Sequence, residues 1–172
     1  MANTHEEICN IGEKILGRND LGEVIGKMLA ERKETVSCAE SCTGGLIAHL
    51  FTSVPGSSAY FLGGVVSYAE SVKTALLGVP AELIDSAGVV SSEVATAMAE
   101  GVRKATKSTY SVATTGFAGP GGDSVGEVWI GVSGPHGSIS KRFYYPGNER
   151  KVNIELFAAS ALELLELYIA GH

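Results

Sequence analysis

The sequence predicts a three-layer α/β/α sandwich, a single α/β domain built on a mixed β-sheet. Short β-branched segments alternate along the chain with segments of helical periodicity, which is typical of helices packed on both faces of a sheet. Two strand-like segments near the C-terminus are separated only by a short turn, which adds an antiparallel hairpin. No internal repeat or linker divides the 172 residues, an ordinary length for one domain.

The first half of the chain is expected to alternate helices and strands. Asp20 and Glu23 have the spacing of a capping box, and apolar residues follow at helical intervals. A short β-branched segment then leads into a glycine-containing turn and another helix, and Gly78 ends a later helix. The expected elements are, in order, helix 21–32, strand 35–39, a helix from Leu46, strand 61–68, helix 70–78 and a helical turn opened by Pro80.

The second half is expected to supply a long helix, three strands and a closing helix. Ser91 or Ser92 caps the long helix. Its apolar face consists of Val94, Ala97, Met98, Gly101, Val102 and Ala105. The expected strands are 110–116, 127–134 and 138–145, followed by an apolar helix that begins near Asn148. Isoleucines at helical spacing predict a separate helical arm over 1–19, so that the main domain covers 20–172.

Charge and composition exclude several classes of function. The net charge of −6 and the pI of about 5.2 provide no global positive field, so direct nucleic-acid binding is not expected. No apolar run approaches the roughly 20 residues of a membrane span, and the N-terminus is acidic where a signal peptide is basic. A cytoplasmic protein without membrane contact is therefore expected. The three cysteines and four histidines lack metal-ligand spacing, so no metal and no cofactor are predicted.

The segment "ESCTGG" carries a candidate nucleophile, Ser41, between a strand and a helix. Backbone N–H groups converge at such a turn, and the helix dipole favours the negative charge that develops in acyl transfer. The alternative, about equally weighted, is that Ser41 and Thr43 only cap the helix while Gly44 and Gly45 permit the turn. Cys42 is a rival nucleophile, but no histidine is placed by the sequence to activate it, so a small buried thiol is expected.

The segment "VVSYAESVK" carries a candidate base. A desolvated lysine loses proton affinity, and Lys73 next to Ser41 would form a serine–lysine pair, with Tyr68 as a third partner. The alternative, which the local sequence favours, is a solvated helix lysine and a half-buried strand tyrosine. The five-residue spacing and the absence of GxGxxG make a short-chain dehydrogenase a weak reading.

The segment "TTGFAGPGG" carries candidate binding residues. Thr114 and Thr115 end a strand with hydroxyl groups available, and glycines such as Gly119 allow a ligand to approach the backbone closely. The segment could therefore floor a pocket. A plain connecting loop is the equally weighted alternative, because a strand and not a helix follows it.

Together the segments "AESCTGG", "VVSYAESVK" and "TTGFAGPGG" resemble the C-terminal domain of the competence/damage-inducible protein CinA, over about residues 21 to 168. Stand-alone members of that family include nicotinamide-nucleotide amidases of the PncC type, and the length predicts this stand-alone form. The resemblance implies hydrolysis of nicotinamide mononucleotide to nicotinate mononucleotide and ammonia. It places the nucleophile on Ser41, the lysine on Lys73 and the assisting tyrosine on Tyr68.

The resemblance and the residues together suggest a mechanism. Neutral Lys73 takes the proton of Ser41, and backbone N–H groups around Cys42 to Gly45 hold the oxyanion. Tyr68 either relays the proton or fixes the lysine, and Glu40 either orients the turn or only accepts hydrogen bonds from it. The predicted partner is a small nucleotide substrate bound by Thr43, Gly44, Gly45, Thr114, Thr115, Gly119 and Arg150, and a homodimer is an open expectation.

The sequence departs from the family pattern at two places. Only Asp123 and Ser124 stand between "GFAGPGG" and "VGEV", where many members have a longer stretch. Two arginines that are plausible phosphate contacts in the family fall on Glu149 and Asn153 here. Neighbouring cations that could compensate are Arg150, Lys151, Lys141 and Arg142. These changes keep two alternatives open. One is an amidase for another nicotinamide derivative. The other is a non-catalytic interaction or ligand-sensing domain linked to competence or DNA-damage responses, as the family name suggests, which would need a protein partner.

Overall fold

A mixed five-stranded sheet forms the centre of the molecule in a computed structural model that describes residues 18 and 20–172. The strand order is β2-β1-β3-β4-β5, and β2, β1 and β3 are parallel whereas β3, β4 and β5 are antiparallel. The strands are β1 (Val36–Glu40), β2 (Phe61–Val66), β3 (Tyr110–Gly116), β4 (Glu127–Gly134) and β5 (Gly137–Tyr144). The predicted helical arm over 1–19 falls almost entirely outside the described residues.

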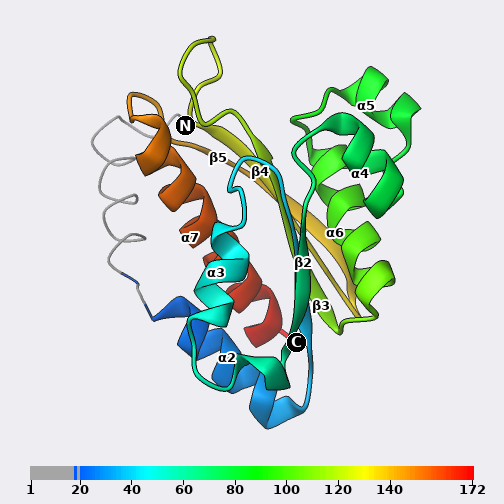
Figure 1. Ribbon diagram of the computed structural model, residues 1–172, viewed down its shortest axis with the longest axis vertical. Coiled ribbons are helices and arrows are strands. Elements are labelled where there is room, and N and C mark those ends of the chain that lie inside the picture. Colours follow the sequence, from blue (N-terminus) through cyan, green and yellow to red (C-terminus); the bar gives the residue numbers. More distant parts are fainter. Residues whose placement is uncertain (1–17, 19) are drawn as a thin grey trace.

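Helices cover both faces of the sheet, which confirms the predicted three-layer α/β/α architecture (Figure 1). One layer contains α2 (Leu21–Arg32), α3 (Leu46–Thr52) and α7 (Arg150–Ala170). The other contains α4 (Glu70–Leu77), α5 (Ala81–Ala87) and α6 (Ser92–Thr106), and a short 3₁₀ helix, η1 (Ser57–Ala59), precedes β2. The chain therefore crosses the sheet after β2 and returns to the first layer only with α7.

The core is divided by the sheet into two apolar clusters. On β1, Cys38 packs into the cluster under α2, α3 and α7, whereas its neighbour Ala39 packs into the cluster under α4 to α6. Val112 and Ala113 divide in the same way on β3. Because these central strands are buried on both faces, their sequences are apolar without the alternation of a half-exposed strand.

Most predicted boundaries agree with the structure within two residues, but one cap is wrong. Ser91 caps α6 as one of the two expected serines, and its hydroxyl accepts a hydrogen bond from the Val94 N–H. Asp20 makes no side-chain cap at α2, because its backbone is helical rather than extended. Its carboxylate instead lies 3.5 Å from Arg18.

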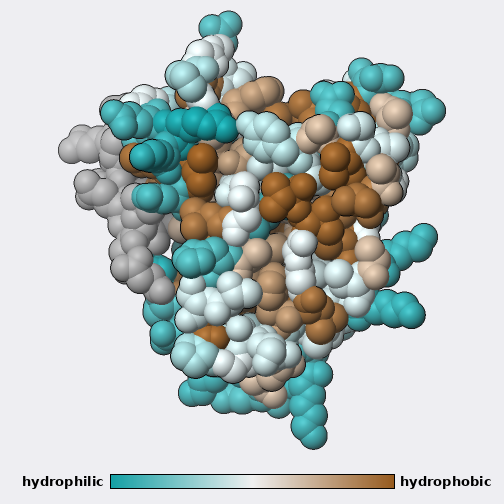
Figure 2. Space-filling model, in the orientation of Figure 1, coloured by the Kyte–Doolittle hydropathy of each residue, from teal (hydrophilic) through white to brown (hydrophobic). Residues whose placement is uncertain are grey.

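Hydrophobic side chains are exposed over the edge of the sheet at β2. Leu62 and Val66 on β2 and Leu76 on α4 are each about half exposed, and Figure 2 shows hydrophobic surface in this part of the molecule. Only β1 pairs with β2, so this edge is open among the described residues. Assembly into a homodimer stays a prediction. Among the described residues, none of the helices combines the length and the hydrophobicity that a membrane span requires.

Candidate active site

The carboxyl ends of the three parallel strands meet at one edge of the sheet, and the predicted site residues other than Arg150 lie at or after these ends. The Ser41 N–H donates to the carbonyl of Thr114 at 3.1 Å, which ties the turn after β1 to the end of β3. The Ser67 N–H donates to the carbonyl of Glu40 at 2.8 Å, which ties the segment after β2 to the same turn. Residues far apart in the sequence are therefore held side by side.

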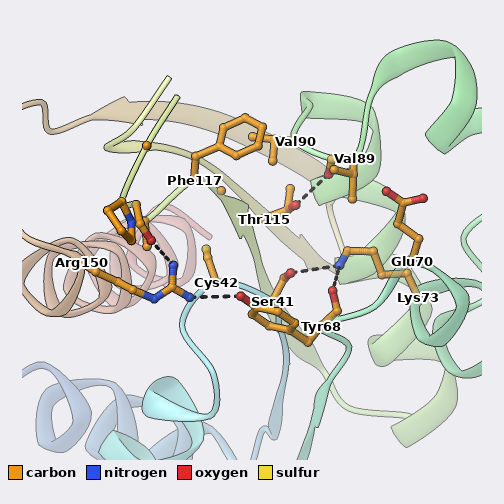
Figure 3. Close-up of a pocket in the computed structure, with 15 residues that line it drawn as sticks. Ser41, Cys42, Tyr68, Glu70, Lys73, Val89, Val90, Thr115, Phe117 and Arg150 are labelled. Atoms are coloured by element: carbon orange, nitrogen blue, oxygen red, sulfur yellow. Dashed lines mark hydrogen bonds between the residues drawn. The ribbon is translucent and has the colours of Figure 1, made fainter. Parts of the chain in front are cut away.

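Ser41 and Lys73 form a direct pair at this edge (Figure 3). Lys73 Nζ lies 3.0 Å from Ser41 Oγ, although the two residues are 32 positions apart. The Lys73 side chain is fully buried, so the expectation of a solvated helix lysine is wrong. Its Nζ also donates to the backbone carbonyl of Ser67 at 2.7 Å and contacts that of Tyr68 at 3.3 Å.

Burial lowers the pKa of Lys73 below its ordinary value. The electrostatic effects of Cys42 and Glu70 act in the opposite direction but are smaller. A neutral amine has two N–H donors and one lone pair, and two backbone carbonyls are available for the donors. The lone pair is then free to accept the Ser41 hydroxyl proton, which is the arrangement that a general base requires.

Glu40 fixes the turn that carries Ser41. Its buried carboxylate accepts hydrogen bonds from the N–H groups of Gly45 at 3.0 Å, Ile47 at 3.1 Å and Ala48 at 2.9 Å. These groups open α3, so a carboxylate five to eight residues upstream caps the helix. The alternative in which Ser41 and Thr43 only cap the helix is therefore wrong.

The hydroxyl groups of the turn have other partners. Ser41 Oγ lies beside Lys73 Nζ, and Thr43 Oγ1 is hydrogen-bonded to Thr114 Oγ1 at 2.8 Å. The Thr43–Thr114 bond is buried and joins the turn to β3. Both threonines thus hold the scaffold of the site and do not line the pocket above it.

The backbone N–H groups expected to bind an oxyanion are only partly available. The Gly44 N–H donates to the Ser41 carbonyl at 3.2 Å, and the Gly45 N–H donates to Glu40. Within the described residues, the N–H groups of Cys42 and Thr43 make no such bond. The N–H groups available to an oxyanion are therefore those of Cys42 and Thr43. The N–H groups of Gly44 and Gly45 already donate hydrogen bonds within the turn.

A pocket of about 300 Å³ opens above Ser41 and Lys73 (Figure 3). Thr115 and Gly119 line it as the sequence predicted, so the loop after β3 is both a hairpin connection and a pocket wall. The lining residues that the sequence analysis missed include Glu70, Val89, Val90, Phe117 and Pro120. Phe117 stands within the glycine-rich motif itself, and its position between strand and glycines could have indicated an exposed aromatic side chain.

Tyr68 and Arg150 face each other across the pocket mouth. The Arg150 guanidinium donates to the Tyr68 hydroxyl at 3.1 Å and also to the backbone carbonyl of Gly119. Tyr68 follows β2 and is 61% exposed, in contrast to the half-buried strand residue of the alternative. Its hydroxyl makes no hydrogen bond to Ser41 or Lys73, so of the two expected roles only fixing the lysine has a contact, through the backbone carbonyl.

The two positions where the resemblance placed arginines carry no cation here, and only Asn153 is part of the packing. Asn153 is fully buried and donates to the Ala118 carbonyl at 3.1 Å, and Glu149 precedes the first residue of α7. Of the four neighbouring cations, only Arg150 lines the pocket. Arg142 pairs instead with Glu127 at 2.9 Å.

The rival nucleophile Cys42 is a buried thiol, as expected. Burial raises its pKa to about 12, so the thiolate is scarce at neutral pH. Burial also raises the pKa of Cys38, which lies under α3. Among residues 18 and 20–172, no group of three or more His, Cys, Asp or Glu side chains is placed to hold a metal ion.

Fold and pocket together define a single-domain α/β protein with a buried serine–lysine pair at the carboxyl edge of its parallel strands. The chain belongs to the CinA C-terminal domain family, and the match to this family covers residues 18–169. The family that the sequence motifs indicated is therefore confirmed.

Relatives of this family share much of the sequence. A CinA-like protein of Desulfotalea psychrophila is 45% identical over 165 residues, which are 92% of this chain and 40% of that protein. A CinA-like protein of Salinibacter ruber is 46% identical over 158 residues, 88% of this chain and 38% of that protein. The chain thus spans about 40% of the length of the curated relatives that it matches.

Solved structures of the family share the fold. The competence/damage inducible protein CihA from Agrobacterium tumefaciens has a TM-score of 0.84 at 34% identity, over 88% of this chain and 94% of that chain. A competence-damaged protein (CinA) superfamily member from Klebsiella pneumoniae has a TM-score of 0.85 at 25% identity, over 90% and 98% of the two chains. These likenesses confirm the single-domain α/β architecture.

Proposed function

We propose that this domain is an amidohydrolase that converts nicotinamide mononucleotide to nicotinate mononucleotide and ammonia. The observation that carries the proposal is the 3.0 Å approach of Ser41 Oγ to the fully buried Lys73 Nζ. A buried, unpaired lysine is costly for a fold unless it is neutral, and a neutral lysine beside a serine is suited to acyl transfer. A domain that only binds a partner would have no use for this pair.

The first half of the proposed reaction forms an acyl-enzyme. Lys73 takes the proton of Ser41 as Oγ attacks the carboxamide carbon. The N–H groups of Cys42 and Thr43 are the donors available to the tetrahedral oxyanion. When the intermediate collapses, the Lys73 ammonium returns its proton to the leaving nitrogen, so that ammonia departs and the nicotinoyl ester on Ser41 remains.

The second half releases the acid. A water molecule gives a proton to neutral Lys73 and attacks the ester carbon, and the ester bond to Ser41 then breaks as the serine recovers its proton. At the pocket mouth, Arg150 is the cation positioned to meet the phosphate of the mononucleotide. Its bonds to Tyr68 and Gly119 hold the guanidinium there before the substrate arrives.

The direct test is the release of ammonia and nicotinate mononucleotide, in equal amounts, by the purified full chain. Nicotinamide riboside, which lacks the phosphate, is the matched comparison and should show a higher KM because Arg150 has no anion to bind. Turnover of the riboside but not of the mononucleotide would show that the substrate is another nicotinamide derivative. The absence of ammonia release from every nicotinamide derivative at high enzyme concentration would contradict the proposal.

The rate should depend on pH in the direction set by a lysine base. Only neutral Lys73 can accept the serine proton, so kcat/KM should increase with pH and level off above the pKa of Lys73. Because burial lowers that pKa, the midpoint should fall below the ordinary lysine value of about 10.4.

A charge variant provides the control for this pH profile. Glu70 raises the pKa of Lys73 electrostatically, so Glu70→Gln should move the midpoint to lower pH. Glu82→Gln removes a carboxylate from α5 that does not line the pocket and should leave the midpoint unchanged. A profile that declines with increasing pH over this range would exclude Lys73 as the base.

A further inference from the structure

Two exposed aromatic side chains flank the pocket above Ser41, and neither side chain makes a hydrogen bond to Ser41 Oγ or Lys73 Nζ. Phe117 is 44% exposed and Tyr68 is 61% exposed, and both line the pocket. They come from different segments, Phe117 after β3 and Tyr68 after β2, and they lie on opposite sides of the site in Figure 3. Neither side chain belongs to the two apolar clusters of the core. Their faces are therefore available to a flat ligand.

The charges around these rings favour a cation at this end of the pocket. Aromatic faces carry negative electrostatic potential and attract positive charge. Glu70 contributes a carboxylate to the same lining. Lys73, with its lowered pKa, adds little positive charge in its neutral form. The remaining cation of the lining is Arg150, which lies across the pocket from Glu70 in Figure 3 and bonds to the Tyr68 hydroxyl.

We propose that Phe117 and Tyr68 form a subsite for a positively charged pyridinium ring, with Glu70 supplying the complementary charge. The subsite makes the protein select the oxidised, cationic form of a nicotinamide nucleotide over its neutral dihydropyridine form. This inference rests on the proposed function, because it takes the ring to be the one whose carboxamide reaches Ser41. The carboxamide end then meets the serine–lysine pair, the ring lies between the aromatic side chains, and the phosphate extends to Arg150.

Binding to a Ser41→Ala variant tests this selectivity without turnover. Nicotinamide mononucleotide and its dihydro form carry the same ribose, phosphate and carboxamide but differ in ring charge, and calorimetry gives their dissociation constants. We expect the oxidised form to bind more tightly. Adding Phe117→Leu should reduce the ratio of the two affinities by roughly three- to thirtyfold. Tyr144→Leu, which removes an exposed aromatic side chain of β5 outside the pocket, should leave the ratio unchanged.

Two further variants separate shape from charge. Phe117→Trp keeps an aromatic face and should preserve the ratio, which also covers the case in which the leucine variant does not fold. Glu70→Gln should reduce the ratio, whereas Glu82→Gln should not. Equal affinities for the two nucleotide forms, undetectable binding of both, or an unchanged ratio in Phe117→Leu would overturn the subsite.

The outcome for the subsite is distinguishable from the outcome for the proposed reaction. A preference for the oxidised form in a protein whose parent releases no ammonia would support the subsite and reject the amidase. Ammonia release by the parent without any preference between the two nucleotide forms would support the amidase and reject the subsite.

Discussion

Ser41→Ala is expected to lower kcat for ammonia release by roughly 10⁴- to 10⁶-fold, because it removes the atom that forms the acyl bond. The neighbouring contacts predict little other damage. Ser41 Oγ is hydrogen-bonded only to Lys73 among the described residues, whereas the turn itself is held by Glu40 and by backbone bonds. The variant should therefore fold and still bind nucleotide. Steady-state kinetics with a melting curve would measure both properties.

Cys42→Ala is the matched control for this nucleophile. The Cys42 thiol is buried and its pKa is raised to about 12, so it is a poor nucleophile at neutral pH. We expect Cys42→Ala to keep most of the activity. If instead Ser41→Ala remained active and Cys42→Ala did not, the acyl group would belong on the cysteine, and the serine–lysine assignment would be rejected.

The fold was largely predictable because local signals coincide with the element ends. The helix was predicted over about 21–32, which agrees with the observed bounds, and Lys33 ends it in a left-handed conformation. The strands over 110–116 and 127–134 were likewise predicted with their observed bounds. The order of strands in the sheet was not predicted, since it depends on crossings between segments that no local pattern fixes.

The pair of Ser41 and Lys73 could be expected for a different reason. Both residues follow parallel strands at one edge of the sheet, and the family motifs link them in the sequence alone. The direction of individual side chains could not be predicted in this way. The Tyr68 hydroxyl bonds to Arg150, which follows it by 82 positions, and Asn153 is buried under the loop after β3. Such partners are set by the packing of α7, which the residues around Tyr68 do not encode.

The role of Glu40 could likewise not be predicted from the residues next to it in the sequence. The strand prediction ended at 39, one residue before this carboxylate, whereas β1 ends with it. As the last strand residue, Glu40 can reach forward to three N–H groups that open α3. A buried carboxylate with several N–H donors is a stable anchor, since each charged hydrogen bond is worth about 1.5–3 kcal/mol. The turn that carries Ser41 is thus held in place by a residue that does not line the pocket.

Glu40→Gln is therefore expected to reduce both stability and turnover. The amide has one acceptor oxygen in place of two, and its NH₂ group faces N–H donors, so we expect a loss of about 2–4 kcal/mol in the free energy of unfolding. Small displacements of a nucleophile are costly, and kcat should decrease by about 10²-fold. KM should change little, because Glu40 does not line the pocket. Urea unfolding and steady-state kinetics would measure these effects.

The comparison variant is Glu93→Gln, which removes a carboxylate from the first turn of α6. Glu93 is exposed, and Ser91 supplies the side-chain cap of that helix, so the variant should lose at most about 0.5 kcal/mol and no activity. If Glu40→Gln behaved like Glu93→Gln in both measurements, the three hydrogen bonds would not fix the turn. If Glu40→Gln instead lowered the free energy of unfolding without any decrease in kcat, Glu40 would have only a stabilising role. If Glu40→Gln lowers both the free energy of unfolding and kcat while KM is preserved, the same hydrogen bonds of Glu40 stabilise the turn and position the nucleophile.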